Sequence, residues 1–177
     1  MAFDLQPYLQ GSLINLRPLS SDDFEALYVA ASDPLIWEQH PAKDRYKRAV
    51  FEKFFLEALE SKGALVALDA KTEEIIGSSR FYELDPQNQS VVIGYTFLKR
   101  KYWGGVYNRE MKRLMLSHAF SHLSEIHFHV GQTNYRSQKA LEKIGALKSG
   151  SFEKIGLGGV SLKSLIYRIV REEWQTR

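Results

Sequence analysis

The sequence of 177 residues contains no cysteine. That absence excludes disulfide bonds, thiolate metal sites and catalysis through a covalent cysteine intermediate, and it suits a reducing compartment. Long hydrophobic runs are also missing, since no stretch approaches the ~20 apolar residues that span a bilayer. The first ten residues lack the basic start and apolar core of a signal peptide. We therefore expect a cytoplasmic protein without a membrane partner.

A large excess of one charge is missing as well. Lys and Arg number 24 against 21 Asp and Glu, which gives a formal net charge of +3. This balance favours anionic ligands but is too small to indicate nucleic acid by itself. No repeat or low-complexity segment interrupts the chain, and its length suits one core. We predict a single domain over residues 1–177.

Apolar periodicity predicts a strand followed by two helices in the first third of the chain. The strand covers 12–19, and Asp22 and Glu25 are placed as a capping box for a helix that ends before Pro34. DPLIWEQHP then reads as an irregular, aromatic connection. A second apolar stripe, of period near 3.6, predicts a helix from Tyr46 to Gly63.

The rest of the chain is predicted to contain shorter strands and helices. Short turn-like separators predict an antiparallel meander of three strands, at 64–68, 75–84 and 90–98. We then expect a helix from Val106, a strand at 125–130, a helix opened by Asn134, and a hairpin of 146–155 and 160–170 across GLGG. Strand, helix, strand implies one parallel pair. The predicted fold is α/β (α+β), a mixed and mostly antiparallel sheet with helices on both faces.

The segment GYTFLKRKYWGGVYNREMKRLML carries the strongest chemical signal, because a strand passes through a glycine-bearing turn into a helix. Free backbone N–H groups and the positive end of the helix then point at one place, and six Lys and Arg side chains crowd around it. A diphosphate would fit there. The turn lacks the Gly-Lys-Ser/Thr of a P-loop, and Val106 and Arg109 interrupt a GxGxxG pattern, so nucleotide hydrolysis and dinucleotide chemistry lose support.

A second segment, VGQTNYRSQKALEKIGAL, follows one crossover later. Together the two segments resemble the acetyl-CoA signature of the GNAT superfamily, in particular the ribosomal-protein N-terminal (alanine/serine) acetyltransferase subgroup. The matching positions are Tyr102, Trp103, Gly104, Asn134, Ser137 and Leu141 to Leu147. The similarity runs from about Leu13 to Trp174.

The resemblance implies that pantetheine lies between two splayed parallel strands. It implies a coenzyme site built from Thr96, Phe97, Leu98, Lys101, Trp103, Gly104, Gly105, Val106, Tyr107, Asn108, Arg109, Asn134 and Ser137. Diphosphate would rest on the backbone N–H groups of 103–108, Asn134 would bond the pantetheine arm, and Ser137 would donate a hydrogen bond to the departing thiolate. An amine would attack acetyl-CoA directly in a ternary complex, with the oxyanion at a backbone N–H near Phe97 or Leu98.

Two positions depart from the subgroup pattern. Val106 stands where glycine or alanine usually ends the phosphate cradle, and Val92 stands where many relatives carry a glutamate that serves as general base. The general base is therefore not assigned by the resemblance. Glu83 is our candidate catalytic residue beside Ser137, with His40, Glu153 or water as alternatives.

The acceptor is a primary amine, either a protein N-terminus or a small molecule, and Trp37 and Tyr82 are our candidates for its binding pocket. The sequence leaves open whether the protein forms a homodimer. His118 and His122 lie at i and i+4, but no HExxH pattern is present, so we expect no metal. The alternatives are a non-catalytic acyl-CoA-binding protein and an RNA-binding module; no run of exposed aromatics interleaves with the lysines, which argues against RNA.

Overall fold

The protein, represented by a computed structural model that describes residues 2–155 and 159–175, is built on one mixed sheet. The strands run in the spatial order β1-β2-β3-β4-β5-β6-β8-β7. They are β1 (Leu9–Gln10), β2 (Ile14–Pro18), β3 (Ala64–Asp69), β4 (Ile75–Asp85), β5 (Ser90–Leu98), β6 (Glu125–Gly131), β7 (Leu147–Ile155) and β8 (Ser161–Val170). All neighbouring pairs are antiparallel except β5 and β6, so the predicted mixed sheet with one parallel pair is confirmed.

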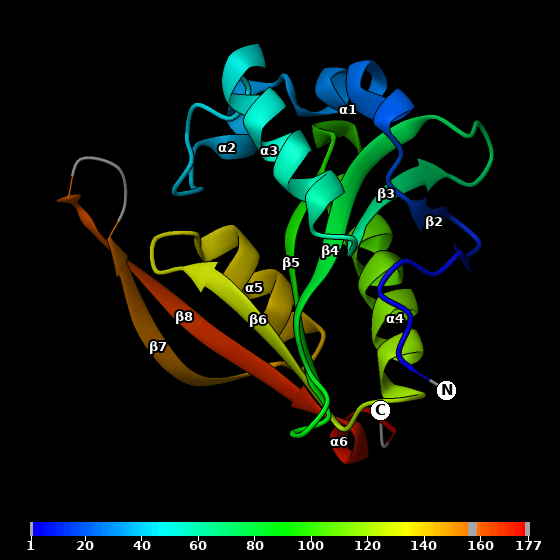
Figure 1. Cartoon of the computed structure of the whole chain (residues 1–177), viewed down its shortest axis with the longest axis vertical. Helices are drawn as coiled ribbons and strands as arrows, with labels where there is room; N and C mark the ends of the chain where they lie inside the picture. Colours follow the sequence, from blue (N-terminus) through cyan, green and yellow to red (C-terminus); the bar gives the residue numbers. More distant parts are fainter. Residues whose placement is uncertain (1, 156–158, 176–177) are drawn as a thin grey trace.

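Helices cover both faces of the sheet (Figure 1). One face carries α1 (Phe24–Ala31), α2 (Pro34–Trp37) and α3 (Arg48–Glu60), whose apolar stripes pack with Phe97 of β5 in one core cluster. The other face carries α4 (Val106–Phe120) and α5 (Tyr135–Lys143), and their buried residues join a second cluster with Ile93 and Ile126. A short α6 (Arg171–Gln175) follows β8. None of the described helices is long and apolar enough to cross a bilayer.

The predicted start of the first helix needs a correction. Ser20 and Asp23, not Asp22 and Glu25, form the capping box, and it precedes a 3₁₀ turn at Ser21–Asp23 rather than α1 itself. Asp23 is buried and also binds Arg17 through two nitrogens, at 2.7 and 2.8 Å. The charge of Arg17 thus compensates the burial of this carboxylate, which the spacing of the sequence alone does not reveal.

The parallel pair separates partway along its length. Register is kept at Ser90, Val91 and Val92 of β5, which face residues 125–127 of β6, and ends there although both strands continue. On its other edge, β5 contains an irregularity opposite Ser79 of β4, and Tyr95 takes a left-handed φ of 53°. A bulge of this kind bends a strand and interrupts its ladder. The gap between β5 and β6 therefore opens beside the bulge.

The predicted C-terminal hairpin is also present, because β7 pairs with residues 161–168 of β8, with one register shift between Lys148 and Gly150. The predicted GLGG turn lies largely outside the described residues, since 156–158 are not described. β8 pairs with β6 on its other side, so the last strand in sequence lies between β6 and β7. β6 is thereby held on the edge that faces away from β5.

Candidate functional site

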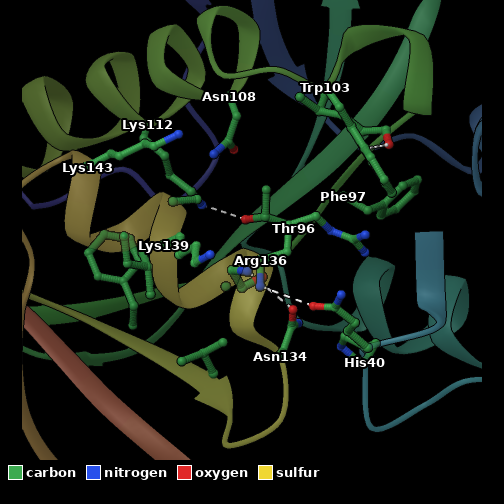
Figure 2. A pocket seen from close by; sticks show the side chains of 18 of the residues that line it. His40, Thr96, Phe97, Trp103, Asn108, Lys112, Asn134, Arg136, Lys139 and Lys143 are labelled. Carbon is green, nitrogen blue, oxygen red and sulfur yellow. Dashed lines mark hydrogen bonds between the residues drawn. The ribbon is translucent and has the colours of Figure 1, made fainter. Parts of the chain in front are cut away.

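A cavity of about 560 Å³ occupies the gap between the diverging ends of β5 and β6. Its walls come from the two strands, the turn into α4 and the first turns of that helix, α5 along its length, and α2 with the segment that follows it. Figure 2 shows side chains of α4 and α5 converging beside Thr96. The lining includes ten of the residues predicted to bind the coenzyme: Thr96, Phe97, Leu98, Trp103, Gly104, Gly105, Asn108, Arg109, Asn134 and Ser137.

The turn from β5 into α4 leaves bare backbone facing the cavity. Gly104 and Gly105 take φ values of 106° and 114°, which residues with a side chain rarely adopt. A Cβ on Gly104 would meet nothing within 4 Å, so the space in front of this backbone is open. Trp103 closes the turn, since its Nε1 donates to the carbonyl of Leu98 at 2.9 Å. The first backbone N–H groups of α4 follow the glycines directly in the sequence. They have no partner within the helix, so they are available to bind an anion.

The start of α5 is fixed by Asn134, as predicted. Its Oδ1 accepts a hydrogen bond of 3.3 Å from the backbone N–H of Ser137, and its side chain is buried. This bond caps the helix and uses the amide oxygen, so the Nδ2 donor stays available for a ligand. Ser137 lies one turn along, half-buried, on the cavity wall.

Four cations surround the wide end of the cavity: Arg109, Arg136, Lys139 and Lys143. The last three were not singled out from the sequence, although their spacing of three and four residues places them on one face of α5. Arg136 is the most constrained. Its guanidinium lies 4.0 Å from the ring centre of Trp103, and its Nη2 donates to the carbonyl of Ile36 at 3.0 Å. These contacts join the α5 wall to α2 and to the turn before α4.

Lys112 of α4 is the buried cation of the cavity wall. Its side chain lies against the Phe128 ring, and its Nζ donates to Oγ1 of Thr96 at 2.5 Å (Figure 2). Burial lowers the pKa of Lys112 to about 7. This amine is therefore divided between its charged and neutral forms near physiological pH.

Three residues of the predicted coenzyme site lie outside the cavity lining. Lys101 is exposed and its Nζ binds Glu74 at 3.1 Å. Val106 begins α4 and is 56% exposed. Tyr107 donates its hydroxyl to Asp69 at 3.2 Å. For Val106 and Tyr107 the predicted contact is made by the backbone N–H group. The positions of their side chains do not block this contact.

The two predicted acceptor residues lie on the α3 side of the sheet, and Tyr82 is not part of the cavity lining. Trp37 is buried and lines the cavity, but its Nε1 donates to the carbonyl of Ala31 at 2.8 Å, so it offers an apolar face. Tyr82 lies behind Tyr95 at a ring-centre distance of 5.1 Å, and its hydroxyl is 3.3 Å from Nδ1 of His129. Burial raises the pKa of Tyr82 well above its ordinary value, so its hydroxyl keeps its proton.

The candidate bases occupy different places. Glu83 is exposed and lines a second, shallower hollow together with His127 and His129. His129 also lines the main cavity, so it connects the two spaces. Burial lowers the pKa of His129 below its ordinary value, which keeps the imidazole neutral at pH 7. From the sequence, His129 was assigned no role in catalysis.

His40 also lines the cavity, but its geometry argues against a role as base. Its Nδ1 accepts the N–H of Ala42 at 2.9 Å, so the neutral ring carries its proton on Nε2. Burial and the charge of Arg45 lower its pKa to about 3. Glu153, the third candidate, is exposed on β7 and accepts a hydrogen bond from Ser161 at 3.0 Å.

The histidines of α4 have structural partners. Nε2 of His118 lies 2.7 Å from the carbonyl oxygen of Asp4, and its ring stacks on Phe3. His122 bonds the Ser121 hydroxyl at 2.8 Å. Within 2–155 and 159–175, no group of three or more His, Asp or Glu side chains is arranged to hold a metal ion.

Comparison with known proteins identifies this arrangement. Residues 14–147 match the sequence profile of the acetyltransferase (GNAT) domain. Among solved structures, a GCN5-related N-acetyltransferase from Brucella melitensis superposes with a TM-score of 0.85 at 18% identity, over 96% of this chain and 81% of that one. A GNAT-family acetyltransferase from Bacillus anthracis gives 0.78 at 20% identity, over 94% and 100%.

A third solved structure contains the coenzyme. The spermidine N-acetyltransferase from Vibrio cholerae, in complex with CoA and spermine, gives a TM-score of 0.71 at 17% identity, over 93% of this chain and 99% of that one. These identities are low, so the superpositions establish the fold, while the profile match covers most of the chain. The chain belongs to the GNAT acetyltransferase family and is an acyltransferase.

Proposed function

We propose that the protein transfers the acetyl group of acetyl-CoA to a primary amine by direct attack in a ternary complex. The observation that carries this proposal is the cavity between β5 and β6, which has a glycine turn with four cations at one end and neutral, aromatic walls at the other. A coenzyme with a charged diphosphate and an apolar arm matches that gradient.

The residues present fit coenzyme A at the charged end. The N–H groups of 103–108 form the start of α4 and its preceding turn, where diphosphate would be held by backbone donors and the helix dipole. Arg109, Lys139 and Lys143 would attract the remaining phosphate charge. The Nδ2 donor of Asn134 would bind the pantetheine arm, since its oxygen is committed to capping.

At the other end the chemistry requires a neutral amine and a site for its proton. The amine nitrogen forms a bond to the thioester carbon, the C–S bond breaks, and coenzyme A leaves as thiolate beside the hydroxyl of Ser137. The oxyanion would accept a backbone N–H near Phe97 or Leu98. We assign the nitrogen's proton to His129, whose Nδ1–H would donate to Tyr82 and leave Nε2 free, with Glu83 as the outer acceptor across the shallow hollow.

The resemblance to the ribosomal-protein N-terminal acetyltransferase subgroup supports a protein N-terminus as acceptor. The spermidine enzyme of Vibrio cholerae, in contrast, acts on a polyamine. Both acceptors are primary amines, so the proposed reaction is the same for each. The two acceptors differ in charge, so the charge of the acceptor end of the cavity distinguishes them.

Thermal stability and coenzyme release test the proposal together. We expect acetyl-CoA and CoA to raise the Tm through mass action, and NAD and ATP to raise it less. A panel of primary amines should release free CoA thiol from acetyl-CoA above the rate of hydrolysis. Equal Tm shifts for all four ligands would refute a pantetheine-specific cleft. Binding of CoA without release in the presence of any amine would leave a non-catalytic acyl-CoA-binding protein.

A further inference from the structure

Two arginines on the α3 side of the sheet have buried nitrogen atoms without hydrogen-bond acceptors. Arg80 of β4 is 5% exposed, and its Nε and Nη2 find no partner among the described residues. Nη1 of Arg45, in the segment before α3, is buried and unpartnered in the same way. Buried N–H donors are normally satisfied, and each one that is not destabilises the folded protein. Two such cations in one place indicate a missing anion.

The two guanidinium groups pack against the walls of the cavity. The Arg80 guanidinium carbon lies 4.0 Å from the ring centre of Tyr95, and that of Arg45 lies 5.2 Å from the Trp37 ring; both rings line the cavity. Both arginines also stack on Phe54 of α3, at 5.6 and 4.4 Å. The rings hold the planes of the guanidinium groups, which favours a planar, two-point ligand such as a carboxylate.

The surrounding charges do not neutralise this pair. No carboxylate in 2–155 or 159–175 lies within 4.0 Å of either guanidinium group. Glu57 and Asp44 act on Arg45 only through their fields, and Arg80 adds a like charge. Burial lowers the pKa of Arg80, and it lowers the pKa of Arg45 to about 10, so both remain charged at pH 7.

The lining of the cavity has the same sign. It includes five cationic side chains and no carboxylate: Arg109, Lys112, Arg136, Lys139 and Lys143. Four of these cations lie at the end assigned to coenzyme A, whose phosphates would neutralise them. The charges left for the acceptor end are those of Arg45 and Arg80, and two uncompensated cations at low dielectric repel an acceptor that carries several positive charges. A polyamine therefore does not suit the acceptor end. An amine that also carries a negative group does.

We propose that Arg45 and Arg80 form an anion subsite that binds a carboxylate of the acceptor, so that the substrate is an amine bearing a carboxylate. This inference rests on the proposed acetyl transfer, whose acceptor it specifies. Tyr95 is 38% exposed, lines the cavity and packs on the Arg80 guanidinium group, so the subsite requires the carboxylate to displace this ring. The carboxylate replaces the missing acceptors of the buried N–H groups.

Matched pairs of acceptors test the subsite. L-Alanine, L-methionine and L-phenylalanine are each compared with their amides, with spermidine included, by release of CoA thiol. Two C-terminally amidated peptides that differ only in aspartate or asparagine at their second residue separate a side-chain carboxylate from the α-carboxylate of a free amino acid. We expect kcat/KM for the acid of at least one pair to exceed that of its neutral partner about tenfold or more.

Variants then assign the preference. Arg80→Met and Arg45→Met keep the aliphatic stem and should reduce the acid-to-neutral ratio towards one. Arg48→Met is the matched control, because Arg48 also stacks on aromatic rings, those of Phe24 and Tyr28, but is exposed and paired with Glu25. The Tm shift caused by CoA shows that each variant is folded. Where one variant does not fold, the other variant and the acid-to-neutral ratio of the wild-type protein still test the subsite.

The outcomes separate the two proposals. Equal rates for acids and neutral partners, or spermidine as the preferred acceptor, would overturn the subsite and leave acetyl transfer intact. If CoA binds but no amine is acetylated, acetyl transfer fails, and the subsite is judged by binding alone. In that case a larger Tm rise with the acids than with their amides, in the presence of CoA, supports it, and equal rises overturn it.

Discussion

The Nζ of Lys112 donates a hydrogen bond of 2.5 Å to Oγ1 of Thr96, and this hydroxyl lies 2.8 Å from Oγ of Ser79. An ammonium group is thus held against the cavity wall by neutral hydroxyls. Such burial is costly for the charged form, which explains why the pKa of Lys112 falls to about 7. The burial of Lys112 therefore lowers the free energy of unfolding, and it places an amine at the cavity wall, in charged or neutral form.

Replacing Lys112 with methionine should therefore stabilise the protein in a pH-dependent way. Between pH 7 and 10.5 the unfolded chain binds more protons at Lys112 than the folded protein does, so stability rises with pH across this window and the cost is largest below it. We expect Lys112→Met to increase the free energy of unfolding by on the order of 1–3 kcal/mol at pH 6 and by little at pH 10. Urea titrations measure this, with the exposed Lys53→Met as control. An equal gain at both values would exclude the charge as the cause.

The cations at the wide end should distinguish coenzyme A from its dephosphorylated form. We expect Arg109→Ala to weaken CoA more than dephospho-CoA, because the cation attracts the 3′-phosphate as well as the diphosphate. Lys101→Ala tests the same predicted role at a residue that Glu74 already pairs, and we expect a smaller effect there. Calorimetric titration of both ligands at two salt concentrations gives the comparison. No change for either variant would remove the cluster from the phosphate site.

Ser137 and Asn134 should separate turnover from binding. Ser137→Ala should lower kcat by less than the ~10²- to 10⁴-fold typical of a lost general acid, since a thiolate needs only a hydrogen bond to leave. Asn134→Ala should mainly raise the KM for acetyl-CoA, and it should also cost about 1 kcal/mol of stability through the lost cap. Steady-state kinetics and thermal melts measure the two effects. If Ser137→Ala abolished CoA binding and spared kcat, the hydroxyl would be a coenzyme clamp.

His129 should set the acidic limb of the pH profile. Because burial lowers its pKa, activity should rise with pH through a value below 6.5 and then stay on a plateau as far as His129 is concerned. His129→Gln should remove that limb and reduce kcat by roughly 10²-fold or more. Glu83→Gln should reduce kcat less, because Glu83 lines only the outer hollow. A limb that survives in His129→Gln would belong to another group.

The sequence predicts those parts of the site that depend on local signals. One such signal is the glycine pair Gly104 and Gly105, which indicates a turn with positive φ just before α4. The other is Asn134, a residue type that caps helices, directly before α5. The separation of β5 and β6 came from the family resemblance rather than from periodicity.

What the sequence did not reveal depends on residues brought together by the fold. Arg45 and Arg80 belong to distant segments and come together only in the folded chain, where both lie near the Phe54 ring. In the sequence, Lys112 is one of the six Lys and Arg residues around the glycine-bearing turn, and residue type alone does not separate it from the other five. It shares the buried stripe of α4 with Met115 and Ala119, three and seven residues on, and that spacing is the signal that could have identified it.

The order of the last two strands bears on how the protein is assembled. β8 is the final strand in the sequence, yet it pairs with β6 along seven residue positions and separates it from β7. Until β8 has been synthesised, the outer edge of β6 carries unpaired N–H and C=O groups that can pair with other chains. Both walls of the cavity are therefore complete only when the ribosome has delivered Ser161–Val170. A nascent chain arrested before this strand is an aggregation-prone species, and truncation there should yield insoluble protein rather than a weakened enzyme.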